Sequence, residues 1–476
     1  MKAFLDEISE WKLEAKSEDN ERYFYYVNHV DKLISGKRNF VIGRKGTGKT
    51  AICEYLTGKS EADYFSNKLT FKSFPFNTLY ELKDEGFTAP NRYITLWKLV
   101  IYSSVLGLLA SNPKINKKLG SNGLDNIKKL ISGDTKNFFR DLTAMNFSLS
   151  AFDCGLEVGF ERNNNGEKVP LNIKVSMLEQ FILNHLDESK YMVVFDELDE
   201  DYKNINDKEI FRQYEELITG LFKAVQDIRT VFKGKCIFPV VFLRNDIYEN
   251  IVDPDKNKWD DFKLELEWDK DKIKDLLAFR LSRAMPDNIK EVSFSTAWRT
   301  IFSSENARIG TKQSKPIQIF EYITLATHSR PRDYIKYISL CCSKAVGKGY
   351  KLPITPEMVK AEEKAYSIYL RNEIIDEISG VLPEIKKILD ILSRIRKQKL
   401  TVAEFKIEYD KDISNKGLSD KGHLYVLEQL YNFSVIGNQP SQNNSQIFKY
   451  QYKESSLNAS EKIVLHRGLF KALQII

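Results

Sequence analysis

Short apolar runs and helically spaced apolar positions alternate along the first half of the chain. Residues 2–35 have apolar positions at helical spacing, and the apolar run at 39–42 predicts a short buried strand. A glycine-rich stretch leads into a predicted helix at 51–56, and alternation at 68–76 predicts another strand. Residues 91–110 predict a strongly apolar helix. This mixture of elements is typical of an α/β fold.

The middle of the chain continues the mixture. Alternating segments at 148–162 and 169–175, joined by a polar turn at 163–166, predict a β-hairpin. A predicted helix at 177–186 then leads into a continuous apolar strand at 191–195.

Two more strand-like segments and several helices follow. A helix at 208–229 precedes an apolar strand at 236–243, and residues 264–268 are strand-like. Asp269 has the position of an N-cap for a helix at 273–285. Further helices are expected across 290–350.

The pattern changes near residue 380. Thr355 and Pro356 begin a predicted helix that continues to about residue 378, and Gly380 and Pro383 end it. Three helices and two strands are then predicted, at 385–395, 401–409, 419–433, 434–437 and 447–452. Three helices followed by a two-stranded wing are the layout of a winged-helix domain.

Composition narrows the class of protein. The 476 residues are 42% hydrophobic and 29% charged, which excludes a mostly disordered, collagen-like or coiled-coil chain. No run approaches the ~18 apolar residues of a membrane helix, and the acidic start of the chain does not fit a secretory signal. Five cysteines without a metal or disulfide pattern predict a reduced, cytoplasmic protein. A net charge of +6 permits nucleic-acid contact but does not require it.

The segment after the first strand matches the P-loop pattern G-x-x-x-x-G-K-[ST]. Its glycines let backbone N–H groups turn towards phosphates, a lysine neutralises the β- and γ-phosphate oxygens, and a hydroxyl binds Mg²⁺. The start of the next helix adds partial positive charge. We therefore expect ATP to be bound by Gly43, Lys45, Gly46, Thr47, Gly48, Lys49, Thr50 and Ala51, with Thr50 on Mg²⁺ and Lys49 also acting in catalysis. The alternative is a glycine- and lysine-rich surface turn.

A second strand ends in two carboxylates. Asp196 and Glu197 follow the apolar strand at 191–195 directly. We predict that Asp196 is the second Mg²⁺ ligand and that Glu197 is the base that polarises the attacking water. The alternative is an acidic, solvated turn.

Basic and amide side chains mark two further positions. Arg244 and Asn245 end the strand at 236–243, where ligands bind in open α/β sheets, and either is a candidate sensor of the γ-phosphate. Arg332, at the start of a later helix, is a candidate to fold over the nucleotide. The alternatives are a solvated loop for Arg244 and Asn245 and a basic surface turn for Arg332. The N-K-x-D match at 257–260 lies in a polar loop, so we interpret it as a coincidence and favour ATP over GTP.

These segments resemble AAA+ ATPases in kind and order. The residues GRKGTGKT, VVFDE, FLRND, LEWD and SRPRD are similar to Walker A, Walker B, sensor 1, the start of the lid and sensor 2. With the C-terminal winged helix, the resemblance extends to Orc/Cdc6-like and STAND ATPases, and to a prokaryotic P-loop ATPase family often encoded near phage-defence genes. The long spacing between Lys49 and Asp196 departs from compact AAA+ modules, and no arginine finger is evident.

The resemblance implies an α/β P-loop NTPase core at 1–262 with an insertion at about 60–185, a helical lid at 263–380 and a winged-helix domain at 381–476. The expected function is an ATP-binding and ATP-hydrolysing switch that regulates a separate protein effector or self-associates, in prokaryotic antiviral defence. A DNA-dependent ATPase that uses the winged helix is the main alternative, and a scaffold that holds nucleotide without hydrolysis is the third. No membrane partner is expected.

Overall fold

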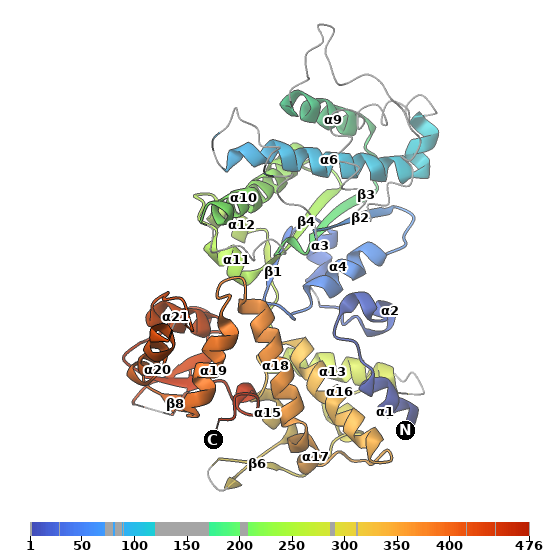
Figure 1. Cartoon of the computed structure of the whole chain (residues 1–476). Helices are drawn as coiled ribbons and strands as arrows, with labels where there is room; N and C mark the ends of the chain where they lie inside the picture. Colours follow the sequence, from blue (N-terminus) through green and yellow to red (C-terminus); the bar gives the residue numbers. More distant parts are fainter. Residues whose placement is uncertain are drawn as a thin grey trace. The chain divides into compact units, whose positions relative to one another are not determined.

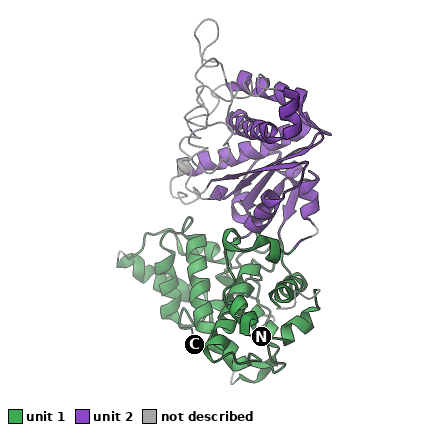
Figure 2. Cartoon of the chain, turned by 90° about the vertical axis from the view of Figure 1, so that its right-hand side faces the viewer, with its two compact units in different colours: residues 1–25, 45–48, 267–476 green, residues 26–44, 49–266 purple. Residues whose placement is uncertain are grey.

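The computed structural model describes residues 2–27, 29–71, 80, 88, 90–119, 171–199, 208–285, 291–310, 313–415, 417–442 and 444–475. They belong to two compact units, coloured in Figure 2. Unit 1 contains residues 1–25, 45–48 and 267–476, and unit 2 contains residues 26–44 and 49–266. The division into three domains expected from the sequence stays a prediction.

Unit 2 is built on a parallel five-stranded sheet, seen in Figure 1. The spatial order of its strands is β2-β3-β4-β1-β5, which is the order found in AAA+ ATPases. The strands are β1 (Phe40–Gly43), β2 (Tyr64–Thr70), β3 (Lys190–Asp196), β4 (Ile237–Arg244) and β5 (Lys263–Glu265). The α/β fold class with a parallel P-loop-type sheet is therefore confirmed.

Helices connect the strands of unit 2. Trp97 packs edge-on against Phe195 of β3, and Phe222 stacks on Phe40 of β1, so the helices that carry Trp97 and Phe222 cover the sheet. The helices are α3 (Val30–Ile34), α4 (Lys49–Gly58), α6 (Ile94–Ser111), α9 (Leu171–His185), α10 (Lys208–Val231), α11 (Asn245–Asn250) and α12 (Lys256–Asp260), with the short η2 (Asn91–Tyr93).

Helix α6 corrects the expectation that no segment of the chain is apolar enough for a membrane helix. With η2 it forms a stretch, Asn91–Ser111, that is long and apolar enough to cross a membrane by length and composition alone. However, 67% of its most apolar window is buried inside the protein. Its apolar character is accounted for by packing against β2, β3, α9 and α10, as in the core helix of a folded domain.

The hairpin prediction fails where the structure can be compared with it. Residues 148–170 lie outside the described residues, but 171–175 belong to α9 and are helical. Val175, Leu178 and Ile182 are buried at helical spacing, so burial on one side of a helix overrides the local alternation.

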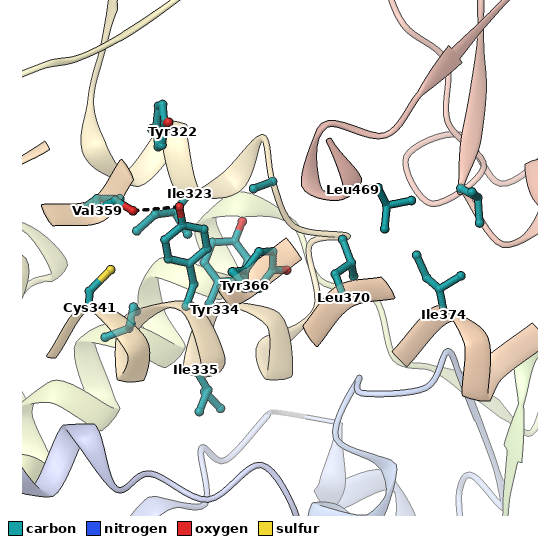
Figure 3. Packing of buried hydrophobic residues seen from close by; sticks show 14 of the residues in the cluster. Tyr322, Ile323, Tyr334, Ile335, Cys341, Val359, Tyr366, Leu370, Ile374 and Leu469 are labelled. Carbon is teal, nitrogen blue, oxygen red and sulfur yellow. Dashed lines mark hydrogen bonds between the residues drawn. The ribbon is translucent and has the colours of Figure 1, made fainter. Parts of the chain in front are cut away.

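Unit 1 contains the remaining helices and two small antiparallel sheets. Its first part comprises α1 (Lys2–Ser9), η1 (Ala15–Ser17), α2 (Asn20–Tyr23), α13 (Lys270–Ala284), α14 (Phe294–Arg299), β6 (Ala307–Ile309), β7 (Lys315–Ile317), α15 (Ile319–Thr324), α16 (Pro331–Gly347), α17 (Pro356–Ala361) and α18 (Glu363–Ile378). Figure 3 shows part of its core. Tyr337 of α16 is buried there and donates a hydrogen bond to the Val359 carbonyl at 3.2 Å. The predicted N-cap is confirmed, because Asp269 accepts from the first backbone N–H groups of α13.

The N-terminal segment at 2–35, which has helical spacing of apolar positions, forms several short helices. It breaks into α1, η1, α2 and α3, because the chain must turn to bring Trp11 and Tyr23 together, with ring centroids 6.2 Å apart. The first 25 residues also pack with unit 1 rather than with the sheet: Ser339 of α16 donates a hydrogen bond to the Ser9 carbonyl at 2.8 Å.

The C-terminal part of unit 1 has the winged-helix layout, with one corrected strand. The elements are α19 (Ile385–Ile395), β8 (Lys399–Leu400), α20 (Val402–Ser414), α21 (His423–Asn432), β9 (Ile436–Gln439), β10 (Lys462–Leu465) and η5 (Arg467–Leu469). The strand expected at 447–452 makes one isolated bridge, between Ile447 and Asn438. Ile447 exchanges both of its backbone hydrogen bonds with Asn438, at 2.8 and 2.9 Å, while β10 pairs along the other edge of β9. Ile463 and Leu465 of β10 are buried in the core of the unit.

Candidate nucleotide-binding site

Four strands of unit 2 end at the same edge of the sheet. In the parallel register Gly43 at the end of β1 lies beside Arg244 at the end of β4, and Thr70 at the end of β2 lies beside Asp196 at the end of β3. Because β3 and β4 are neighbours, the positions chosen from the sequence come from adjacent strands. This is the edge of an α/β sheet at which ligands bind.

The P-loop connects β1 to α4. Gly46 and Gly48 have φ angles of +81° and +98°, which side chains rarely tolerate. Space around a Cβ at position 48 is open, so backbone conformation alone demands glycine there. The loop delivers Lys49 and Thr50 into the first turn of α4, whose N-terminus attracts anions.

Lys49 lies among charged groups of unit 2. Its Nζ donates hydrogen bonds to the carbonyl oxygens of Gly43 at 2.7 Å and Arg44 at 3.0 Å. The pKa of Lys49 is lowered to about 8, chiefly by burial and also by the Arg244 charge, while Asp199 and Asp196 oppose the shift. The lysine therefore lies within electrostatic range of both strand ends.

Asp196 is buried and only partly compensated. Its Oδ2 accepts no hydrogen bond among the described residues and lies 3.9 Å from Lys68 Nζ. Burial raises the pKa of Asp196, and Lys68 acts in the opposite direction. A buried carboxylate oxygen without a hydrogen bond is a group that a cation would stabilise.

Glu197 is held in a specific orientation. Its backbone has a φ of +58°, a strained conformation for a residue with a side chain. Thr70 Oγ1, at the end of β2, donates a hydrogen bond to Glu197 Oε2. The strand next to β3 therefore fixes the carboxylate that the sequence suggested as the base.

Arg244 and Asn245 have different surroundings from each other. Arg244 is buried and donates to both carboxylate oxygens of Asp246, at 3.0 and 2.7 Å, and lies 3.5 Å from Asp199. The Asn245 amide instead donates to Glu249, on the exposed side of α11. Of the two candidate sensors, Arg244 is the one in electrostatic contact with Lys49.

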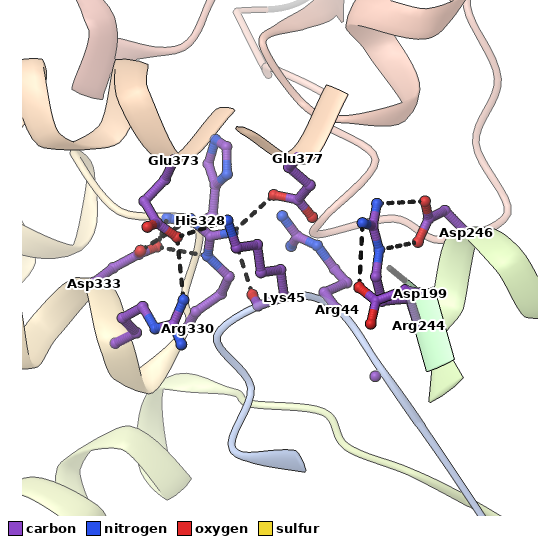
Figure 4. Close-up of polar contacts among 12 residues, drawn as sticks. Arg44, Lys45, Asp199, Arg244, Asp246, His328, Arg330, Asp333, Glu373 and Glu377 are labelled. Carbon is purple, nitrogen blue, oxygen red and sulfur yellow. Dashed lines mark hydrogen bonds and ion pairs between the residues drawn. The ribbon is translucent and has the colours of Figure 1, made fainter. Parts of the chain in front are cut away.

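Residues 45–48 of the loop pack within unit 1. Trp268 Nε1 donates a hydrogen bond to the Thr47 carbonyl at 2.9 Å, and Arg330 donates to the Lys45 carbonyl at 3.3 Å. A Cβ at Gly46 would lie 3.3 Å from the Cβ of Arg332, so the predicted sensor 2 arginine lies against the loop. Figure 4 shows the contact between Arg330 and Lys45.

The two arginines at the start of α16 have different surroundings. Arg330 is fully buried and is bound by both carboxylate oxygens of Asp333, at 3.0 and 3.1 Å, and by Glu377 at 3.2 Å. Arg332 is partly exposed and pairs with Glu373 at 3.2 Å. Arg330 is therefore a structural anchor, whereas Arg332 remains accessible.

The residues present fit a nucleotide with Mg²⁺. The loop offers a helix N-terminus and a lysine, and the neighbouring strand offers one buried carboxylate oxygen. No group of three or more His, Cys, Asp or Glu in the described part of the chain could hold a metal ion without other ligands. A cation held by Thr50 and Asp196 would need phosphate and water oxygens as well, which suits Mg²⁺.

Comparison with known proteins gives distant similarities. Residues 271–375 match the family model of the FunZ-associated C-terminal helical domain. A protein of Escherichia coli (strain K12) that carries the name of a transposon gamma-delta 80.3 kDa protein is 23% identical over 465 residues. That alignment covers 90% of this chain but 61% of the relative, so the chain spans less than two thirds of the relative's length.

Two solved structures are also similar. One is the Drosophila origin recognition complex (ORC) bound to DNA, with 12% identity, a TM-score of 0.31 and coverage of 100% of this chain and 92% of that chain. The other is Cdc6p from Pyrobaculum aerophilum, with 11% identity, a TM-score of 0.30 and coverage of 98% and 96%. TM-scores this low give no support to a fold assignment. The AAA+-type fold is assigned from the strand order of the sheet alone.

Several residues of the site had no sequence signal. Thr70 ends a strand with no motif, Trp268 was only part of a strand-like segment, and Glu373 lies in the middle of a helix. Their roles come from contacts over long sequence separations, which no local pattern records. The N-K-x-D match lies in α12, a helix in which Trp259 is buried.

Proposed function

We propose that this chain binds ATP with Mg²⁺ and hydrolyses it. The observation that carries the proposal is the meeting of the P-loop lysine, a buried aspartate and an oriented glutamate at one edge of an AAA+-type sheet. Lys49 would bind the β- and γ-phosphates, and Thr50 and Asp196 would hold the metal. When bound, Mg²⁺ neutralises phosphate charge and polarises the phosphoryl oxygens.

The protein's own groups have separate roles in this proposal. Glu197, oriented by Thr70, accepts the proton of the attacking water. Arg244 is already neutralised by Asp246, so it acts at the end of β4 as one part of an ion pair rather than as a free cation. Gly43, Lys45, Gly46, Thr47, Gly48 and Ala51 complete the phosphate-binding segment.

Nucleotide binding and phosphate release test the proposal. We expect Lys49→Ala to lose ATP binding and Glu197→Gln to keep binding but lose turnover. The exposed Lys233→Ala and Glu188→Gln make the same chemical changes in unit 2 away from the strand ends, and both should behave like the wild type. Binding that survives in Lys49→Ala refutes the site, and turnover that survives in Glu197→Gln refutes its role as base.

The regulatory part of the proposal is an ATP-driven switch of the STAND type acting on a separate protein effector or through self-association. It is supported by the family resemblance of the motifs. Particle mass measured with and without ATP tests self-association, and phage plaquing on cells that carry wild-type or Lys49→Ala copies tests the role in antiviral defence. Equal plaquing on both strains would remove that role.

A DNA-dependent ATPase is the second candidate, and the winged helix offers one specific observation in its favour. A groove of about 820 Å³ lies between β8, the start of α20 and the base of the wing. Lys399, Lys406 and Lys462 line it together with hydroxyl and amide side chains, against a single acid, Glu461. Among the described residues, Lys399 and Lys462 are in no ion pair, which leaves them available to phosphate groups.

The third helix of the winged-helix domain, α21, is less suited to DNA contact than this groove. α21 exposes Leu424 and Tyr425, at 49% and 37% of their surface, rather than cations. The groove beside the wing is therefore the better candidate for backbone contacts. The similarity to a protein named for a transposon is a further reason to test DNA first.

Fluorescence anisotropy with a labelled duplex, at 50 to 200 mM salt, tests this candidate. Replacing Lys399 and Lys462 with alanine should weaken binding and reduce the slope of log affinity against log salt by about 2. Replacing Lys386 and Lys471, which are exposed outside the groove, removes the same charge and should change the slope less. ATP turnover that is indifferent to DNA would refute this function.

A further inference from the structure

One carboxylate in unit 1 holds two cations that border the phosphate-binding loop. Glu373 Oε2 lies 3.2 Å from Arg332 Nη1 and 3.6 Å from Lys45 Nζ. The three side chains are 17%, 24% and 28% exposed, so none is sealed in the core. Figure 4 shows Glu373 and Lys45 together.

The neighbouring arginine shows that this pairing is not needed to anchor α16. Arg330 has two carboxylates of its own, Asp333 and Glu377, and is buried at 1% exposure. The cluster at Arg330 is therefore charge-compensated and solvent-excluded. At Glu373, by contrast, one partly exposed carboxylate is shared by two partly exposed cations, so among the described residues neither Lys45 nor Arg332 has a carboxylate of its own.

We propose that Glu373 is a counter-ion that the phosphates of a bound nucleotide displace from Lys45 and Arg332. The inference rests on the proposed function. A nucleoside triphosphate brings more negative charge than one carboxylate, and phosphate oxygens accept from Arg332 in the same way that Glu373 does. Glu373 therefore competes with the nucleotide and weakens its binding, more for a triphosphate than for a diphosphate.

The competition has a mechanical consequence, because Glu373 belongs to α18. This helix is tied to the C-terminal segment by Arg467 and Glu363 at 3.1 Å and by the hydrogen bond from the Ala472 N–H to Ser367 Oγ at 2.9 Å. In Figure 3, Leu370 of α18 lies close to Leu469. Release of Glu373 therefore removes an attachment of the helix that leads into the winged-helix domain.

Glu373→Gln removes the charge and keeps the shape of the side chain. Two partly exposed ion pairs are lost, so we expect ATP affinity to rise about threefold to tenfold, with a smaller gain for ADP. Asp376→Asn makes the same change on the same helix at an exposed position and should leave both affinities unchanged. Affinities are measured by titration with a fluorescent ATP analogue and, in competition, with ATP and ADP.

A second measurement does not use turnover. Hydrogen exchange of the segment 363–378 should increase in the wild type when ATP binds, whereas Glu373→Gln should show the faster exchange already without nucleotide. In Arg332→Gln, the added Glu373→Gln change should raise ATP affinity less than it does alone, because one of its two partners is missing.

The outcomes separate the two proposals. Failure of the wild type to bind ATP, with Lys49→Ala no different, refutes the proposed function. ATP binding that depends on Lys49 but is unchanged in Glu373→Gln, together with unchanged exchange of 363–378, overturns the role of Glu373 alone. A rise in affinity that Asp376→Asn reproduces also overturns it, because the effect would then be a general charge effect.

Discussion

ATP binding should weaken steeply above pH 8 because of Lys49. Burial lowers the pKa of this lysine to about 8 in the ligand-free protein. Phosphates placed next to its ammonium group favour the charged form, so the pKa rises again when ATP binds. Binding therefore takes up a proton whenever the pH lies between the two pKa values.

The size of the effect follows from the shift. If bound phosphate restores the ordinary pKa of lysine, affinity falls about 30-fold between pH 7 and pH 9.5, and binding at pH 8.5 takes up about 0.7 proton. Isothermal titration calorimetry in two buffers with different ionisation enthalpies measures the uptake directly. The same titrations at pH 7 provide the control, since Lys49 is then almost fully protonated in both states.

Folding stability should respond to pH in the opposite direction. The pKa of Lys49 is lower in the folded than in the unfolded chain, so the unfolded chain binds more protons between about pH 8 and pH 10.5. Lys49 therefore adds stability to the ligand-free protein as pH rises through this window, while ATP binding weakens. Lys49→Met, which has no group that titrates at this position, should remove the rise in stability. Proton uptake of zero at pH 8.5, or affinity that stays constant up to pH 9.5, would refute the reasoning.

Two further predictions concern single contacts. Thr70→Val removes the hydrogen bond to Glu197 and should lower the rate of phosphate release about tenfold, equivalent to about 1.4 kcal/mol. ATP affinity should stay unchanged. An equal loss of affinity would contradict a purely orienting role for Thr70. Gly468→Ala would place a Cβ 2.1 Å from the Ala326 carbonyl oxygen. It should lower the free energy of unfolding, measured with denaturant, by about 1–3 kcal/mol. Gly347→Ala has open space around its Cβ and should be neutral or stabilising.

Local sequence patterns predicted the parts of the site that are contiguous in the chain. The P-loop is eight consecutive residues, and Gly46 and Gly48 have the positive φ angles that such a turn requires. The strands before Asp196 and Arg244 were predicted from continuous apolar runs, because a strand buried on both faces needs apolar residues throughout. These strand ends lie next to one another because β3, β4 and β1 are neighbours in the sheet.

Local patterns failed where burial and pairing in the folded domain decide the type of element. Residues 171–175 alternate like a strand, yet burial of Val175 with the following turns of α9 makes them helical. In the wing, Ile447 makes only a single bridge to Asn438, whereas the segment that carries Ile463 forms a four-residue ladder with the other edge of β9. Burial depends on the whole domain, so a window of a few residues cannot decide between them.

The sequence by itself determined that this chain carries a phosphate-binding loop, a strand that ends in a carboxylate and a strand that ends in an arginine. Each of these features lies within a few consecutive residues. Only the tertiary structure decided which side chains act on them. Thr70 meets Glu197, Trp268 meets Thr47, and Arg332 meets Glu373 across long stretches of chain. The physical reason is that such pairs depend on distance and burial in the folded protein. Neither quantity can be deduced from the spacing of residues along the chain.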